Sequence, residues 1–135
     1  MPETEAQALI NRFMEEVINR RNFAVMDELV AADFVEHVPF PGQGPGRDGL
    51  RHVLENFHRA FPDLHWKADE QIASGEKVVT RFTWTGTHRA DFLGIPATGK
   101  NVSVWGIVID VVHNGKFVES RILMDVMGLM AQLQA

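Results

Sequence analysis

The spacing of apolar side chains divides the chain into a helical N-terminal part and a strand-rich C-terminal part. Near the N-terminus, apolar residues recur every three or four positions, which is the spacing of a helix with one buried face. Thr4 and Gln7 match a capping box at the start of this run, so we expect the helix to begin there. Its apolar face consists of Ala6, Ile10, Phe13, Met14, Val17 and Ile18.

Two more helices are predicted before residue 63. Asn22 can cap a short second helix, and Asp48 can cap a third helix that ends before Pro62. Their apolar faces consist of Phe23, Met26, Leu29 and Val30 in the second helix, and of Leu50, Val53, Leu54 and Phe57 in the third. Between them, a brief extended segment at 34–38 leads into a loop at 39–46, because the prolines and glycines of that loop fit neither a helix nor a strand.

The rest of the chain is predicted to form a sheet. Asn114-Gly115 is typical of a tight hairpin turn, and a short helix could follow the last strand at 126–133. Helices that precede a run of antiparallel strands indicate an α+β domain whose helices cover one face of the sheet. The predicted strands, most of them rich in β-branched and aromatic residues, span 64–73, 77–88, 101–113 and 116–125.

The hairpin turn sets the register of the last two strands. With Asn114 and Gly115 as the loop residues, Val112 faces Phe117, and Val104 lies roughly opposite Asp125. One face is then nearly all apolar and consists of Trp105, Ile107, Ile109, Val111, Val118, Ile122 and Met124. The other face consists of Val104, Gly106, Val108, Asp110, Glu119, Arg121, Leu123 and Asp125. This mixed face has the apolar walls and polar groups that a ligand pocket needs.

Length and composition exclude several classes of function. The 135 residues fit a single domain, 1–135, and the net charge of −5 argues against a nucleic-acid or anionic-membrane surface. Without cysteine, a disulfide, a thiolate zinc site and a cysteine nucleophile are ruled out. The histidines match no recognised ligand spacing, so we expect no metal site. Neither a secretory signal nor a membrane-spanning run is evident, and the expected location is the cytoplasm.

Asp125 is a lone carboxylate in the apolar run 122–127. If the side chain were buried there, desolvation would raise its pKa well above the ordinary value and make it a proton-transfer group near neutral pH. The alternative is a carboxylate that caps the turn or helix after the strand.

Two histidines are further candidates. His88 ends a predicted strand before a long loop, where it could donate to a substrate oxygen or simply be exposed. His37 could bind substrate beside the 39–46 loop, although adjacent Glu36 and His37 would point to opposite faces of a strand.

Four other side chains are candidates for substrate binding. Arg81 and Arg121 could bind an anionic group, but either could instead pair with a carboxylate and lower its pKa. Phe40 belongs to the loop at 39–46, which we interpret as a lip over the pocket, and Trp105 could belong to the core, to an interface or to the pocket wall.

Several short sequence motifs, taken in order along the chain, resemble those of the SnoaL-like polyketide cyclase family of the nuclear-transport-factor-2-like superfamily. They are Glu36-His37 before the loop, and the segments 60–64, 85–88, 94–100 and 114–119, followed by Asp125 and 128–130. The resemblance implies a cone-shaped α+β barrel, in which a curved antiparallel sheet wraps the N-terminal helices around an internal pocket. It also implies a homodimer, which the apolar sheet face would favour.

Members of that family close a ring by intramolecular aldol condensation without a cofactor, and the resemblance gives Asp125 the acid/base role. Arg121 departs from the family, which commonly has tryptophan there, and this puts the substrate in doubt. The leading hypothesis is therefore a cofactor-free aldol cyclase acting on a small hydrophobic carbonyl compound. An isomerase or hydratase in the same pocket is one alternative, and a non-catalytic small-molecule-binding dimeric domain is another.

Overall fold

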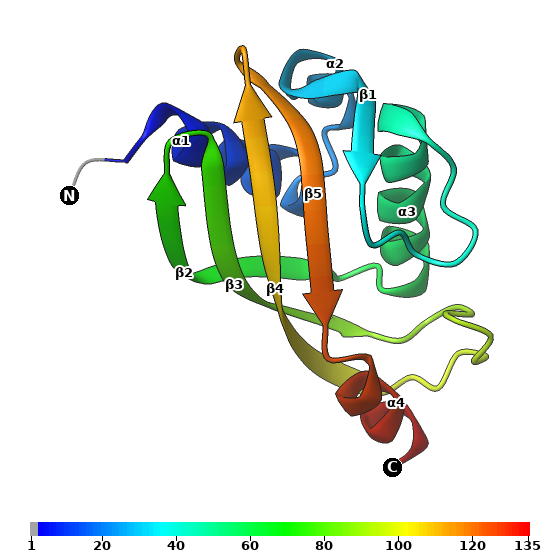
Figure 1. The fold of residues 1–135 in the computed structure, drawn as a ribbon. Coiled ribbons are helices and arrows are strands. Elements are labelled where there is room, and N and C mark those ends of the chain that lie inside the picture. Colours follow the sequence, from blue (N-terminus) through cyan, green and yellow to red (C-terminus); the bar gives the residue numbers. More distant parts are fainter. Residues whose placement is uncertain (1–2) are drawn as a thin grey trace.

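A five-stranded sheet curves around the N-terminal helices in the computed structural model, which describes residues 3–135 (Figure 1). The strand order is β1-β5-β4-β3-β2, and β1 is parallel to β5 whereas the other pairs are antiparallel. The strands are β1 (Val30–Glu36), β2 (His65–Ser74), β3 (Lys77–Thr87), β4 (Asn101–His113) and β5 (Lys116–Met124). The helices are α1 (Glu5–Arg12), η1 (Phe13–Asn19), η2 (Phe23–Val25), α2 (Met26–Leu29), α3 (Gly46–Ala60) and α4 (Val126–Gln134). The predicted α+β class and element order are confirmed, and one edge pair of the sheet is parallel.

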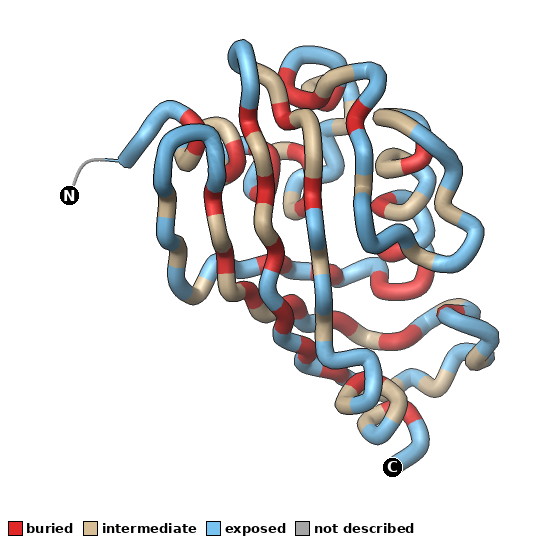
Figure 2. Tube along the Cα trace, in the orientation of Figure 1, coloured by how far each residue is buried: buried red, intermediate tan, exposed pale blue. Residues whose placement is uncertain are grey.

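The predicted capping box starts α1. The backbone N–H of Gln7 donates to Thr4 Oγ1 over 3.0 Å, and the Gln7 side chain accepts from the Thr4 backbone. After Arg12 the helix widens into the π-helix η1, and both helices bury the predicted apolar face. In Figure 2, buried residues alternate with more exposed ones along these helices. Among the described residues, no helix is long and apolar enough to cross a membrane.

The predicted caps of the next two helices have different outcomes. Asn22 stands at the N-cap position of η2 as predicted, although its side chain makes no capping hydrogen bond. Asp48 is not the cap of α3, because it lies inside the first turn of this helix, which begins at Gly46. Gly46 has φ +72°, and a Cβ there would lie 2.7 Å from the carbonyl oxygen of Ala32. The start of α3 is therefore fixed by a close approach to β1, which no local capping signal reveals.

The register of the β4–β5 hairpin differs from the prediction by one residue. Val112 pairs with Phe117 as expected, but Val111 pairs with Glu119, because Val118 is an extra residue in β5. Such a bulge moves every later side chain of the strand to the opposite face. As a result, Asp125 N donates to the carbonyl oxygen of Trp105 over 2.8 Å instead of lying opposite Val104.

The two faces predicted for β4 are correct, whereas those predicted for the second half of β5 are reversed. Asp110 and its alternate neighbours on β4 are buried on the concave face of the sheet. On β5 the concave face carries Ser120, Ile122 and Met124. Glu119, Arg121 and Leu123, which were predicted to join Asp110, alternate with them and face outward.

At Gly106, strands β4 and β5 approach each other so closely that there is no room for a side chain. A Cβ at this position would lie 2.4 Å from the carbonyl oxygen of Leu123 and 2.5 Å from the ring of Phe82. We expect Gly106→Ala to lower the free energy of unfolding by about 1–3 kcal/mol through overpacking, measured by urea unfolding. Gly44→Ala is the control, because a Cβ there meets nothing within 4 Å. Equal stabilities of the two variants would contradict this packing.

Candidate acid–base pocket

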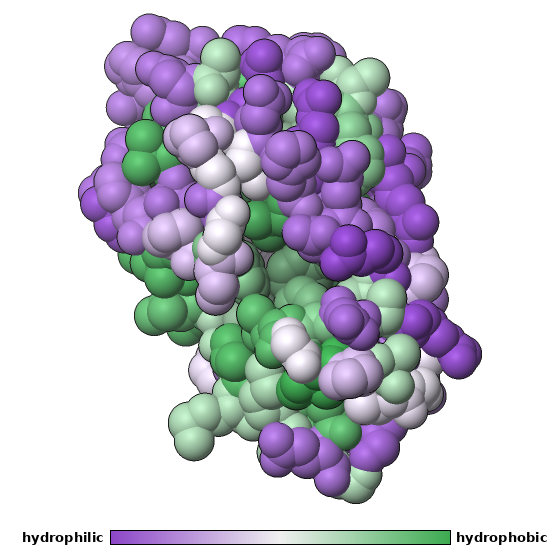
Figure 3. Space-filling model, turned by 90° about the vertical axis from the view of Figure 1, so that its right-hand side faces the viewer, coloured by the Kyte–Doolittle hydropathy of each residue, from purple (hydrophilic) through white to green (hydrophobic). Residues whose placement is uncertain are grey.

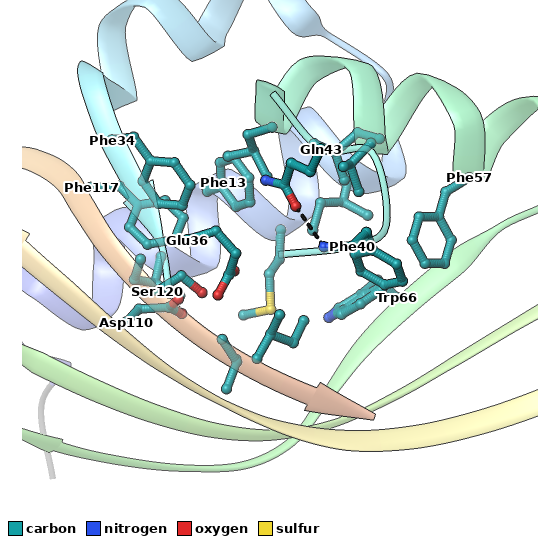
Figure 4. Close-up of a pocket in the computed structure, with 18 of the residues that line it drawn as sticks. Phe13, Phe34, Glu36, Phe40, Gln43, Phe57, Trp66, Asp110, Phe117 and Ser120 are labelled. Atoms are coloured by element: carbon teal, nitrogen blue, oxygen red, sulfur yellow. Dashed lines mark hydrogen bonds between the residues drawn. The ribbon is translucent and has the colours of Figure 1, made fainter. Parts of the chain in front are cut away.

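An apolar cavity of about 70 Å³ lies between the concave face of the sheet and the helices (Figure 4). Its polar lining side chains, within residues 3–135, are Glu36, Gln43, Asp110 and Ser120. The walls are aromatic and aliphatic and consist of Ile10, Phe13, Met14, Ile18, Phe34, Phe40, Leu50, Val53, Leu54, Phe57, Trp66, Val108, Phe117, Ile122 and Met124. The lining therefore combines a large apolar surface with a few polar groups, as small-molecule sites do.

The inner cavity continues into a wider outer chamber of about 420 Å³. Phe40, Gln43, Val53 and Phe57 line both spaces, and the 88–100 loop contributes Asp91, Phe92, Leu93 and Gly94 to the outer one. On the side of the molecule that carries α3 and this loop, the surface has a hollow with apolar residues along its floor and lower edge (Figure 3). A ligand larger than the inner cavity could therefore extend into the outer chamber.

Three polar side chains form one row across three neighbouring strands. Ser120 on β5 pairs with Asp110 on β4 and, on its other side, with Glu36 on β1. Their oxygen atoms point toward one another at one end of the cavity (Figure 4). The extra residue in β5 is what turns Ser120 inward and completes the row.

Asp110 is a buried carboxyl with only 4% of its surface exposed. Desolvation raises its pKa to about 8, the Ser120 hydroxyl opposes this shift, and the nearby charge of Glu36 adds to it. The raised pKa means that Asp110 holds a proton at neutral pH and can donate it.

Glu36 is less deeply buried and has more donors around it. Desolvation raises its pKa, while hydrogen bonds from the backbone N–H groups of Val38 and Ile122 and from the Ser120 hydroxyl act against this rise. The Val38 bond is 3.0 Å long. Glu36 is therefore the member of the pair better suited to carry the negative charge, and Asp110 the one better suited to stay protonated.

The structure places Asp125 outside the cavity. The side chain is exposed and caps α4, since its Oδ1 accepts from the backbone N–H of Gly128 over 2.9 Å. This is the capping arrangement that the sequence left open as the alternative. The catalytic role predicted for Asp125 stays a prediction, and the placement gives it no support.

The two predicted histidines also lie apart from the acid pair. His88 is fully buried, stacks on Phe61, and its Nδ1 accepts from the backbone N–H of Thr98 over 3.2 Å. It therefore anchors the 88–100 loop and is not among the described residues that line the cavity. His37 pairs with Glu119, Nε2 to Oε1 at 2.7 Å, beside the row, while its neighbour Glu36 faces inward.

The remaining predicted residues divide between the cavity and the outer face. Phe40 lines the inner cavity and the outer chamber, as expected of the 39–46 loop. Arg81 pairs with Glu70 and Asp69 outside the cavity. Arg121 and Trp105 are exposed on the outer face of the sheet, with half of the Trp105 surface accessible.

Asp110 and Glu36 were not selected from the sequence as catalytic candidates. Asp110 interrupts the apolar run 107–112 in the same way that Asp125 interrupts 122–127, so the signal that singled out Asp125 was present there too. Strand alternation had also placed Asp110 on the mixed face correctly. Among the described residues, no group of three or more His, Asp or Glu side chains could hold a metal ion.

Comparisons with known proteins identify the family of the chain. The sequence model of the SnoaL-like polyketide cyclase family matches residues 8–133. The chain belongs to this family, which is part of the nuclear-transport-factor-2-like superfamily. The family resemblance read from the motifs is thereby confirmed. No curated protein matches the chain.

Several solved structures share the whole fold. TsrD from Streptomyces laurentii is 28% identical, with a TM-score of 0.87 over 98% of this chain and 97% of that chain. IdmH from Streptomyces antibioticus, a candidate polyketide cyclase, is 28% identical, with a TM-score of 0.85 over 98% of this chain and 100% of that chain. A candidate SnoaL-like polyketide cyclase from Jannaschia sp. CCS1 has a TM-score of 0.88 at 22% identity over 98% and 94% of the two chains, and supports the fold alone.

The raised pKa of Asp110 predicts a pH-dependent stability. The folded protein keeps this proton up to about pH 8, whereas the unfolded chain releases it near the ordinary value of 3.8. Between these values the folded state binds more protons, so stability falls as pH rises. We expect Asp110→Asn to flatten this fall when the free energy of unfolding is measured in urea at several pH values. Parallel curves for the two proteins would contradict a protonated Asp110.

Proposed function

We propose that this SnoaL-like protein catalyses acid–base chemistry on a small apolar carbonyl compound, as an intramolecular aldol cyclase, with Asp110 as general acid and Glu36 as general base. The observation that carries the proposal is a pair of carboxyls in different environments that face one apolar cavity. Asp125 is not required in this mechanism.

Glu36 takes a proton from the carbon next to a carbonyl group. The resulting enolate carbon attacks a second carbonyl of the same molecule, and Asp110 gives its proton to the oxygen of that carbonyl as the ring closes. Apolar walls favour this step, because a hydrogen bond or proton donor acts more strongly on a developing oxyanion where water is excluded. The family membership supports ring closure as the overall reaction.

Proton abstraction from carbon can be tested without the natural substrate. We expect the protein to accelerate exchange of the α-protons of 2-tetralone in D₂O, followed by proton NMR, since this is the first step of aldol closure and of double-bond migration alike. Glu36→Gln and Asp110→Asn should each reduce the exchange by about 10²–10⁴-fold, the usual contribution of a general base or acid.

Asp125→Asn is the comparison variant, because asparagine also caps helices and should preserve α4. Its exchange rate should stay close to that of the wild type. Loss of exchange in this variant together with near-normal rates in the other two would overturn the proposed pair and support the role that the family resemblance gives to Asp125. Binding of 2-tetralone without exchange in any variant would favour a non-catalytic binding domain.

We also propose that a second copy of the chain covers part of the outer sheet face. Ile107 pairs with Leu123, Trp105 lies two residues away on the same face, and all three are exposed, Leu123 by 68%. Burial of such a patch in a homodimer would be favourable by about 25 cal/mol per Å² of apolar surface.

Light scattering tests the dimer. We expect a dimeric mass for the wild type and a shift toward the monomer for Leu123→Lys, because a cation would have to be buried in the interface. Ile72→Lys on β2 is the control, since Ile72 is equally exposed, at 69%, but lies outside the patch. A wild-type monomer would contradict this assignment.

A further inference from the structure

After aldol ring closure, the two carboxyls of the proposed acid–base pair have the wrong protonation states to begin another reaction. A carbon–carbon bond forms, a carbonyl π bond breaks, and the product has the same atoms as the substrate. Glu36 has gained the proton from carbon, and Asp110 has lost its proton to oxygen. Before the next cycle, one proton must return from Glu36 to Asp110.

Ser120 stands between the two carboxyls at the point where this proton must pass. It pairs across the sheet with both Glu36 and Asp110, and only 3% of its surface is exposed. Its hydroxyl lies beside the oxygen atoms of both carboxyls at one end of the cavity (Figure 4). A hydroxyl has one proton and free lone pairs, so it can donate to one carboxylate while it accepts from the other carboxyl when that group is protonated.

We propose that Ser120 passes a proton from Glu36 to Asp110 after each reaction and so restores the pair without water. This inference rests on the proposed function. Protonated Glu36 donates to Ser120 Oγ while the Ser120 hydroxyl donates its own proton to the Asp110 carboxylate. Two O–H bonds form and two break, and the serine is a neutral hydroxyl before and after the step, with its new O–H bond turned toward Glu36. Ser120 acts through the two carboxyls and is a positioning residue.

The surroundings favour an exchange confined to these three groups. Glu36 and Asp110 are the two titratable side chains among the described residues that line the cavity, and α1, η1, β2 and α3 contribute apolar side chains to that lining. On β3, Asp110 pairs with the buried Val78. His37, the residue next to Glu36, is engaged elsewhere, because its Nε2 lies 2.7 Å from Glu119 Oε1.

Carbon-13 NMR of the carboxyl carbons tests the link in the ligand-free protein. In the wild type, both carboxyl carbons should respond to the same titration steps, because the proton is shared through Ser120. In Ser120→Ala, the Glu36 carbon should no longer follow the Asp110 step, and the Asp110 midpoint should rise by about 1–2 pH units after loss of a hydrogen bond to a charged group.

Two variants make this measurement specific. Ser120→Thr retains a hydroxyl and should keep the shared titration, which also guards against a folding defect in the alanine variant. Ser103→Ala removes a serine on the exposed face of β4 and should titrate like the wild type. Superimposable titration curves for the wild type and Ser120→Ala would overturn the relay.

Ring closure of the simple diketone 2,6-heptanedione gives a kinetic readout that a static structural role would not produce. Ser120→Ala should release about one product per site in a burst and then continue at least about tenfold more slowly, since only the return of the proton is impaired. Ser120→Thr should show no burst. A uniformly slowed, burst-free reaction in the alanine variant would contradict the relay.

The two proposals can fail separately. If the wild type closes no ring, the cyclase mechanism fails for this diketone, and the carboxyl titration still decides whether Ser120 links the pair. If the ring closes and Glu36→Gln abolishes the reaction while Ser120→Ala titrates and reacts like the wild type, the mechanism stands and the relay is wrong.

Discussion

One extra residue in β5 determines which side chains reach the cavity. Because Val118 is not matched by a residue on β4, the strand changes face at this point, and Ser120 turns inward while Arg121 turns outward. A strand without the bulge would place Glu119 opposite Asp110 and Arg121 opposite Val108 on the same face, so charged side chains would replace Ser120 beside Asp110. The protonation of Asp110, and with it the chemistry of the pocket, therefore depends on a local irregularity in strand pairing.

The contrast between the two carboxyls follows from where each stands in the sheet. Asp110 lies on an interior strand, with β3 and β5 on either side, so desolvation dominates its environment. Glu36 ends the edge strand β1, where the chain turns away from the sheet and leaves backbone N–H groups free to bind its oxygens. The same type of side chain is thus suited to the proposed role of acid at the centre of the sheet and to the proposed role of base at its edge.

The elements of the fold could be predicted from the sequence more fully than the site. The strands after residue 63 match their predicted bounds within one residue, because alternation and the Asn114-Gly115 turn are local signals. The start of α3 was missed because it depends on contact between Gly46 and Ala32, which are distant along the chain. The bulge carries no sequence signal of its own, and the counting error that it introduced placed Arg121 and Asp125 on the face that carries Asp110. The choice of Asp125 as the acid/base residue came from its apolar surroundings and from the family resemblance.

The 39–46 loop bears on selectivity in a way that the strands do not. Gln43 holds the loop in a turn through hydrogen bonds with Phe40, and it lines the inner cavity, the outer chamber and a further hollow beside Phe34 and Glu36. The proposed acid and base stand on hydrogen-bonded strands, whereas the rim of the cavity belongs in large part to this segment. Substitutions in the loop could therefore redirect the protein to ligands of other shapes during evolution while the proton chemistry beneath it stays intact.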